Sequence, residues 1–128
     1  MRYRIYYEDT DCGGIIYHAN YFKYCERARS EIFFANNLIP QDQHGYFVVK
    51  SLQAQFLAPG KLGDTLEVIT KLKELKKISV ILEQEVVKVA PQNARLFSMQ
   101  IKLGFISQDT HTPAPISTSF ITLLKSLL

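Results

Sequence analysis

Two carboxylates, a glycine pair and a histidine lie close together near the N-terminus, where residues 7–18 read YEDTDCGGIIYH. Asp9 and Asp11 can each act as a general base, a nucleophile or a metal ligand. Gly13 and Gly14 let backbone N–H groups approach a ligand without a side chain in the way. This combination of residues is typical of a small active site.

A long helix is predicted directly after this segment, from Asn20 to about Asn36. Asn20 is the predicted N-cap, and Asn36 and Asn37 followed by Pro40 predict the end of the helix. His18 then lies at the helix N-terminus, where unpaired N–H groups can hold a carbonyl oxygen that gains negative charge. A carboxylate facing such a site indicates acyl transfer. Helical spacing predicts one buried face with Tyr21, Tyr24, Cys25, Ala28, Ile32 and Ala35, and one solvent face with Lys23, Glu26, Arg27 and Arg29.

The rest of the chain reads mainly as strands. Alternating or β-branched runs predict strands in 2–7, 47–56, 66–72, 78–89 and 95–107, whereas 117–128 fits either a short helix or another apolar segment. One long helix followed by strands predicts an α+β, hot-dog fold in which an antiparallel sheet of about five strands wraps the helix. We expect one domain spanning residues 1–128. Because one helix cannot cover a wide sheet and one sheet edge stays exposed, we also expect a second copy to bind.

Composition excludes several classes of protein. The chain has 128 residues, 47% of them hydrophobic, which suffices for one core. No apolar run approaches the roughly 20 residues of a transmembrane segment, so a cytoplasmic location is expected. The net charge is only +3, and the chain lacks the dense pattern of basic residues found in nucleic-acid-binding proteins. Cys12 and Cys25 are too few for a disulfide framework or a structural zinc site, and Cys25 is expected to serve packing.

Three motifs resemble the signatures of the hot-dog acyl-CoA thioesterases of the 4-hydroxybenzoyl-CoA and YbgC type. They are Tyr7-x-Asp9-x-Asp11-x-x-Gly14-x-x-x-His18-Ala19-x-Tyr21, then Glu26-x-Ala28-Arg29, and then Phe56-x-x-Pro59-x-x-x-Gly63-Asp64-x-Leu66. The resemblance covers nearly the whole chain. It implies hydrolysis of acyl-CoA to a free acid and coenzyme A by a homodimer or homotetramer, with no cofactor and no metal.

The resemblance also implies roles for individual residues. Asp11 is the expected general base or nucleophile, and His18 the second catalytic residue, which orients the substrate or a water molecule. The thioester carbonyl is expected to lie against backbone N–H groups around Tyr17 and His18. Residues expected to bind the substrate are Tyr7, Gly14, Tyr17 and Tyr21.

Other interpretations of the same residues remain open. Asp9 and Asp11 also suit a capped glycine-rich turn, and for Asp9 we favour this structural role. Cys12 departs from the usual family pattern and provides a rival nucleophile with His18 as its base. A calcium loop needs a glutamate where this chain has Asn20, and a metal-dependent phosphatase needs a larger α/β domain.

Two other functions compete with hydrolysis. One is a weakly catalytic scaffold, possible near the inner membrane, that binds acyl carrier protein, phospholipid-synthesis enzymes or the Tol-Pal envelope system. The other is a hydratase acting on enoyl thioesters, whose motif spacing fits less well. The lysines at 71, 73, 76 and 77 suit either coenzyme A phosphates or carrier protein, or a solvated strand edge, and we favour the solvated edge. The sequence leaves the acyl length and the carrier open.

Overall fold

The computed structural model describes residues 1–90 and 93–128. Its elements in chain order are β1 (Arg2–Arg4), the 3-10 turn η1 (Tyr7–Asp9), α1 (Ala19–Phe34), β2 (Gly45–Phe56), β3 (Thr65–Leu75), β4 (Ser79–Lys88), β5 (Ala94–Ser107) and α2 (Thr118–Lys125). The predicted α+β arrangement with five antiparallel strands is confirmed. Residues 117–128, which the sequence left open, contain the short helix α2.

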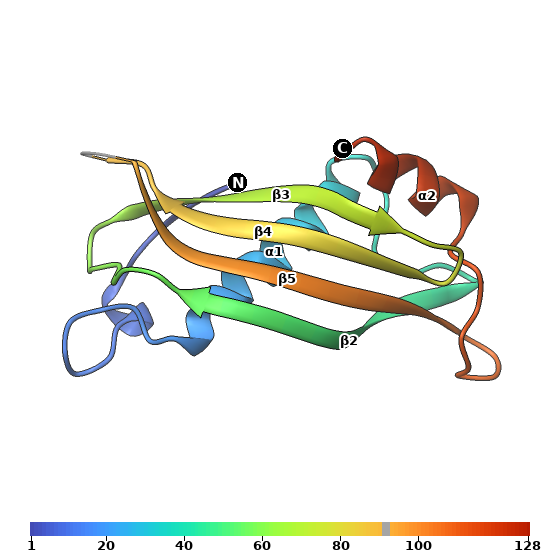
Figure 1. Cartoon of the computed structure of the whole chain (residues 1–128), viewed down its shortest axis with the longest axis horizontal. Helices are drawn as coiled ribbons and strands as arrows, with labels where there is room; N and C mark the ends of the chain where they lie inside the picture. The colour runs from blue at the N-terminus through green and yellow to red at the C-terminus, as the bar shows by residue number, and fades with distance from the viewer. Residues whose placement is uncertain (91–92) are drawn as a thin grey trace.

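The five strands form one antiparallel sheet in the order β1-β3-β4-β5-β2. Figure 1 shows α1 lying across one face of this curved sheet. The predicted alternation in β5 is confirmed, because Phe97, Met99, Ile101 and Phe105 are all buried. The first predicted strand is shorter than expected, since the chain leaves the sheet after Arg4 and turns at η1. The sheet therefore ends in the long strand β2 on one side and the short strand β1 on the other.

The buried face of α1 matches the prediction over the first half of the helix. Tyr21, Tyr24, Cys25 and Ala28 are buried, but at the far end Phe33 is buried and Ala35 is exposed. The predicted N-cap was wrong: His18 occupies that position, and Asn20 lies buried in the first turn. The helix also ends earlier, at Phe34. As predicted, an asparagine prevents the helix from continuing, because Asn37 adopts a left-handed backbone conformation with φ of 58°.

Arg29 does not lie on the solvent face that the sequence predicted. Its side chain is half-buried between α1 and the sheet, where Nη1 donates a hydrogen bond to Gln84 Oε1 at 2.9 Å. Gln84 is fully buried on β4, and its Nε2 donates to Cys25 O and to Thr70 Oγ1, both at 3.0 Å. Because the buried amide of Gln84 needs hydrogen-bond partners, its contact with Arg29 accounts for the inward position of the arginine side chain. Burial lowers the pKa of Arg29.

The short helix α2 lies beside the end of β3, near the C-terminal end of α1 (Figure 1). Phe120 is buried there in a cluster with Phe33 and Phe105, at ring-centroid distances of 5.2 and 6.0 Å. The segment preceding α1 lies at the opposite end of the molecule. Within the described residues, neither α1 nor α2 has the length and hydropathy that crossing a bilayer requires.

Candidate active site

The segment before α1 folds into a tight hairpin that presents Asp11. Thr10 and Ile16 form an isolated β-bridge, and the N–H of Asp11 donates to Ile15 O at 2.9 Å. The turn closes where Gly14 N donates to Asp11 O at 3.1 Å, with Gly14 at φ of 79°. Glycine adopts this backbone without the Cβ penalty that other residues meet. The glycine pair thus shapes the turn that carries the carboxylate.

The carboxylate of Asp11 is exposed and held by one of its oxygens. Oδ1 accepts a hydrogen bond from Gly13 N at 2.8 Å, an arrangement typical of aspartate in turns. A Cβ added to Gly13 would lie 3.2 Å from this oxygen, so glycine leaves room for the carboxylate to fold back. No other donor in the described chain contacts the Asp11 side chain. Oδ2 is therefore available for a proton or an electrophile.

The third sequence motif packs directly against the hairpin. Ile16 N donates to Gly60 O at 2.9 Å, and Ile15 pairs with Lys61 in another isolated bridge. A Cβ on Gly60 would lie only 2.3 Å from Ile16 Cδ1, so any larger residue here would force the Ile16 side chain to move. Asp64 fixes the neighbouring turn, because its Oδ2 accepts a hydrogen bond from Lys61 N at 2.9 Å. The fold thereby joins two motifs that are far apart in the sequence.

The N-terminus of α1 supplies free N–H groups next to the hairpin. Tyr17 N donates to Asp9 O at 2.9 Å, and Asn20 N donates to Tyr17 O at 2.9 Å. Within residues 1–90 and 93–128, the N–H groups of His18 and Ala19 have no acceptor. Of the N–H groups expected around Tyr17 and His18, that of Tyr17 is therefore already bonded to Asp9 O in this structure. The available pair is His18 and Ala19.

Aromatic rings surround His18. Its ring lies 4.5 Å from the ring of Tyr17 and 6.0 Å from that of Phe56, which ends β2 and is 53% exposed. Tyr21 lies one layer deeper: it is 3% exposed and stacks on Phe97 at 5.0 Å. The sequence identified Phe56 only as the first residue of a motif, because nothing local indicates that it meets His18.

The structure places the other predicted site residues around the same hairpin. Tyr7 is 83% exposed in η1, and Gly14 closes the turn. Asp11 and His18 are both exposed, and no hydrogen bond joins them in the described parts of the chain. A single copy therefore leaves this surface open to solvent.

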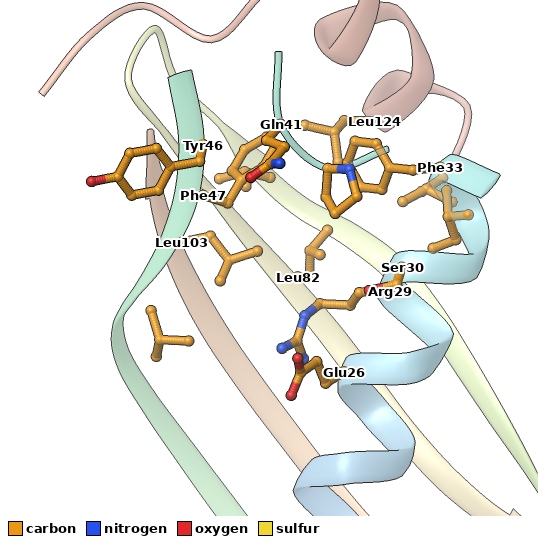
Figure 2. Close-up of a pocket in the computed structure, with 15 residues that line it drawn as sticks. Glu26, Arg29, Ser30, Phe33, Gln41, Tyr46, Phe47, Leu82, Leu103 and Leu124 are labelled. Atoms are coloured by element: carbon orange, nitrogen blue, oxygen red, sulfur yellow. The ribbon is translucent and has the colours of Figure 1, made fainter. Parts of the chain in front are cut away.

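A cavity of about 390 Å³ lies between the C-terminal half of α1 and strands β2, β4 and β5. Figure 2 shows leucine and phenylalanine side chains on its walls, with Glu26 and Arg29 entering from α1. The helix rises about 1.5 Å per residue, so Arg29 lies roughly 16 Å along the axis from His18. The cavity is thus well separated from the Asp11 hairpin of the same chain. Its apolar walls include Phe33, Phe47, Leu82, Leu103 and Leu124.

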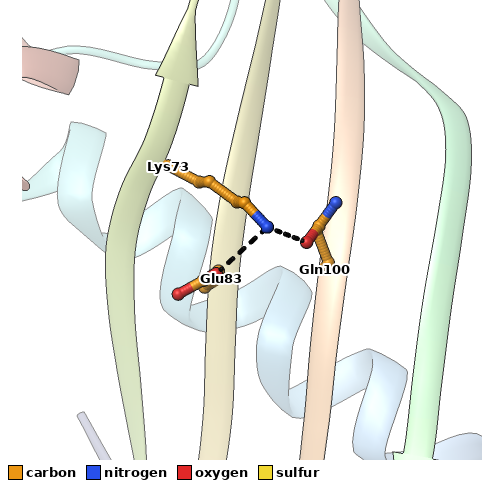
Figure 3. Close-up of polar contacts among 3 residues, drawn as sticks. All are labelled: Lys73, Glu83 and Gln100. Atoms are coloured by element: carbon orange, nitrogen blue, oxygen red, sulfur yellow. Dashed lines mark hydrogen bonds and ion pairs between the residues drawn. The ribbon is translucent and has the colours of Figure 1, made fainter.

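The lysines of β3 and the following turn lie away from the Asp11 hairpin. Lys73 Nζ lies 3.6 Å from Glu83 and donates to Gln100 at 2.6 Å, on the sheet face opposite α1 (Figure 3). Lys76 pairs with Glu74 at 3.4 Å. These contacts fit the solvated strand edge that the sequence favoured.

The two cysteines have different environments. Cys25 is fully buried, and burial raises the pKa of its thiol to about 12. Its expected packing role is confirmed. Cys12 is exposed in the hairpin next to Asp11, where the predicted rival nucleophile would have to act.

Comparison with known proteins gives consistent results. Residues 13–94 match the family model of the thioesterase superfamily. The chain is 47% identical to the acyl-CoA thioesterase YbgC of Helicobacter pylori strain 26695, covering 99% of this chain and all of that protein. It is 37% identical to the acyl-CoA thioester hydrolase YbgC of Escherichia coli O6:H1, covering 95% and 92%.

Solved structures show the same fold at lower identity. A 1,4-dihydroxy-2-naphthoyl-CoA thioesterase from Synechocystis aligns with a TM-score of 0.89 at 20% identity, covering 99% of this chain and 95% of that one. A mutant 4-hydroxybenzoyl-CoA thioesterase complexed with 4-hydroxybenzoyl-CoA aligns with a TM-score of 0.86 at 20% identity, covering 97% and 96%.

Proposed function

As a member of the thioesterase superfamily the chain is an enzyme that hydrolyses acyl-CoA thioesters, and we propose that Asp11 and the first turn of α1 carry out this reaction. The observation that supports this proposal is the free pair of N–H groups at His18 and Ala19, beside a hairpin that presents the Asp11 carboxylate. One oxygen of that carboxylate accepts a hydrogen bond from Gly13 N, and the other has no donor in the described chain. The scaffold alternative is not favoured.

The proposed reaction begins with the thioester carbonyl oxygen at the N–H groups of His18 and Ala19. These donors and the helix dipole stabilise the negative charge that develops on the oxygen, and each such donor typically lowers the barrier by about 3 kcal/mol. Asp11 Oδ2 then takes a proton from an attacking water, or attacks the carbonyl carbon to give a mixed anhydride that water hydrolyses. In either route the C–S bond breaks and coenzyme A leaves as a thiol after gaining a proton.

Neighbouring residues would bind and orient the substrate. The exposed rings of Tyr7 and Tyr17 offer apolar contacts, and the turn at Gly14 lets the substrate approach the backbone. His18 would orient the acyl group or the water. Tyr21 is buried, so its part in binding would be to support Phe56, whose ring lies 5.9 Å away.

We further propose that the enzyme is a homodimer joined along β2. Apart from an isolated bridge between Tyr46 and Gln41 at its start, this strand pairs only with β5 in the described chain, so the rest of its other edge is free, and Val49, Leu52 and Phe56 are 53, 41 and 53% exposed. A second β2 would continue the sheet and cover these side chains. It would also close the cavity beside β2, which lies far from the Asp11 hairpin of its own chain and is therefore a candidate site only for an acyl chain bound at the hairpin of the second copy. A homotetramer would need an additional surface.

Replacement of Asp11 tests the proposal directly. Asp11→Asn keeps the shape of the side chain but removes its charge, so turnover should fall by at least about 100-fold, the usual contribution of a general base. The assay follows free coenzyme A from short, long and aromatic acyl-CoAs, and the preferred acyl group is also offered on acyl carrier protein.

Asp109→Asn, which neutralises an exposed carboxylate after β5, is the matched control and should retain wild-type turnover. Equal turnover by the Asp11→Asn variant and the wild type would contradict the proposed role. Turnover only with the carrier protein would identify that protein as the acyl donor.

A further inference from the structure

We propose that Asn20 is a positioning residue for the reaction. Its side-chain amide holds the main-chain carbonyl of Asp9 and thereby sets the position of Asp11 relative to the N–H groups of His18 and Ala19. The inference rests on the proposed function, because it concerns how that site is held together. Asn20 itself touches none of the reacting groups and acts through Asp9.

Two donors from the start of α1 converge on the carbonyl of Asp9. Asn20 Nδ2 donates to Asp9 O at 2.9 Å, and Tyr17 N donates to the same oxygen at 2.9 Å. A carbonyl oxygen has two lone pairs, so these bonds satisfy it fully. Asn20 is only 9% exposed, and a buried side-chain amide is costly unless it is paired. The contact is therefore a fixed part of the fold.

The side chain of Asp9 is also held by a hydrogen bond. Its Oδ2 accepts a hydrogen bond from Tyr6 N at 2.9 Å. Tyr24, 3% exposed on α1, lies near this carboxylate: burial raises the pKa of the Tyr24 hydroxyl and the charge of Asp9 raises it further, although the hydroxyl has no hydrogen-bond partner among the described residues. Asp9 is thus tied at its main chain and side chain to different parts of the chain.

This arrangement connects the two halves of the active site. Asp9 lies two residues before Asp11, and Tyr17 directly precedes His18, whereas residues 11–15 between them are exposed. The contact of Ile16 with Gly60 anchors the hairpin to another loop. The Asp9 clamp, which we define as Asp9 with Tyr17 N and Asn20 Nδ2, anchors it to α1. A displacement of about 1 Å in a catalytic group can lower a rate about 100-fold, so loss of the clamp should be visible in kcat.

The test removes the Asn20 amide in two ways. Asn20→Ala deletes it, and Asn20→Leu replaces it with an uncharged side chain of similar shape that preserves packing. Asn36→Ala is the matched control, because Asn36 Nδ2 also donates to a backbone carbonyl of α1, Ile32 O, at 2.8 Å, but at the other end of the helix. Thermal unfolding gives the folded fraction of each variant, and each rate is divided by the concentration of folded protein.

We expect kcat for acyl-CoA hydrolysis to fall about 10- to 100-fold in both Asn20 variants, with a much smaller change in KM. Hydrogen exchange at the Tyr17 amide, followed by NMR, should accelerate in both variants, because the second donor to Asp9 O is lost. The Asn36→Ala variant should match the wild type in kcat, KM and exchange at Tyr17.

Wild-type kcat and Tyr17 exchange in the Asn20 variants would overturn the proposal, as would equal losses in the Asn36→Ala variant. The Asp11→Asn variant separates this failure from failure of the proposed function. If that variant is inactive while the Asn20 variants have wild-type kcat, only the clamp is refuted. If it is fully active, the proposed chemistry fails, and exchange at Tyr17 still decides whether Asn20 fixes the loop.

Discussion

The two glycines of the Asp11 hairpin have different physical tasks. Gly14 provides left-handed backbone, with φ of 79° and no side chain or backbone within 4 Å of an added Cβ. Gly13 provides space, because its added Cβ would lie 3.2 Å from Asp11 Oδ1. Gly14 therefore avoids backbone strain, and Gly13 allows the Asp11 carboxylate to take its position.

Alanine at each glycine should separate these tasks. Gly14→Ala is expected to lower the free energy of unfolding by about 1–2 kcal/mol, the cost of left-handed backbone for a residue with a Cβ. Gly13→Ala should change stability less but lower kcat/KM at least about 10-fold, because the methyl group displaces Asp11. Urea unfolding and acyl-CoA hydrolysis measure the two effects. Equal stability losses in the two variants would contradict this division.

At the scale of elements, the packing of α1 on the sheet depends on a polar contact inside an apolar interface. Gln84 on β4 contacts the helix backbone at Cys25 O and the side chain of Arg29, and it also contacts Thr70 on β3. Apolar contacts are non-directional, whereas these hydrogen bonds are satisfied at only one position of the helix. Gln84 thus fixes where the middle of α1 lies over the sheet.

Gln84→Leu should therefore lower the free energy of unfolding by about 2–3 kcal/mol, because it leaves the half-buried Arg29 guanidinium and the Thr70 hydroxyl without their partner. Urea unfolding monitored by circular dichroism measures this loss. The matched substitution Gln55→Leu, at an exposed position of β2, should change stability little. A similar effect of both substitutions would show that the buried contact has no special role.

The sequence predicted elements well and contacts between elements less well. Periodicity identified α1 and the strands because each buries one face, and the hairpin motif predicted a role for Asp11 because the chemistry of its neighbours is local. Asn20 and Arg29 were assigned to a cap and to solvent, since their true partners are the distant Asp9 carbonyl and Gln84. No local pattern indicates a buried glutamine in β4. The free N–H pair at His18 and Ala19 likewise depends on a tertiary contact, because Asp9 occupies the N–H of Tyr17.

At the scale of the whole molecule, the proposed dimer predicts a coupling between assembly and activity. Leu52→Lys places a charge at the free edge of β2 and should increase the monomer fraction, because lysines at sheet edges oppose strand pairing. If the second copy closes the acyl cavity, hydrolysis of long acyl-CoAs should fall with the dimer fraction. Analytical ultracentrifugation and kinetics over a protein dilution series measure both quantities.

Ile69→Lys provides the control for this substitution, because Ile69 is 40% exposed, close to the 41% of Leu52, but lies on β3. It should leave the sedimentation coefficient unchanged. A Leu52→Lys variant that sediments like the wild type would rule out β2 as the interface.

The strand order also determines when the molecule can fold during its synthesis. β2 leaves the ribosome before β3 and β4, yet its partner in the sheet is β5, which is made after both of them. Contacts between strands as far apart in sequence as β2 and β5 form slowly, and a strand that has not yet paired is prone to aggregate. The nascent chain therefore exposes β2 until almost the whole polypeptide has emerged. Chaperone demand and inclusion-body formation should consequently depend more on the sequence of β2 than on that of the Asp11 hairpin.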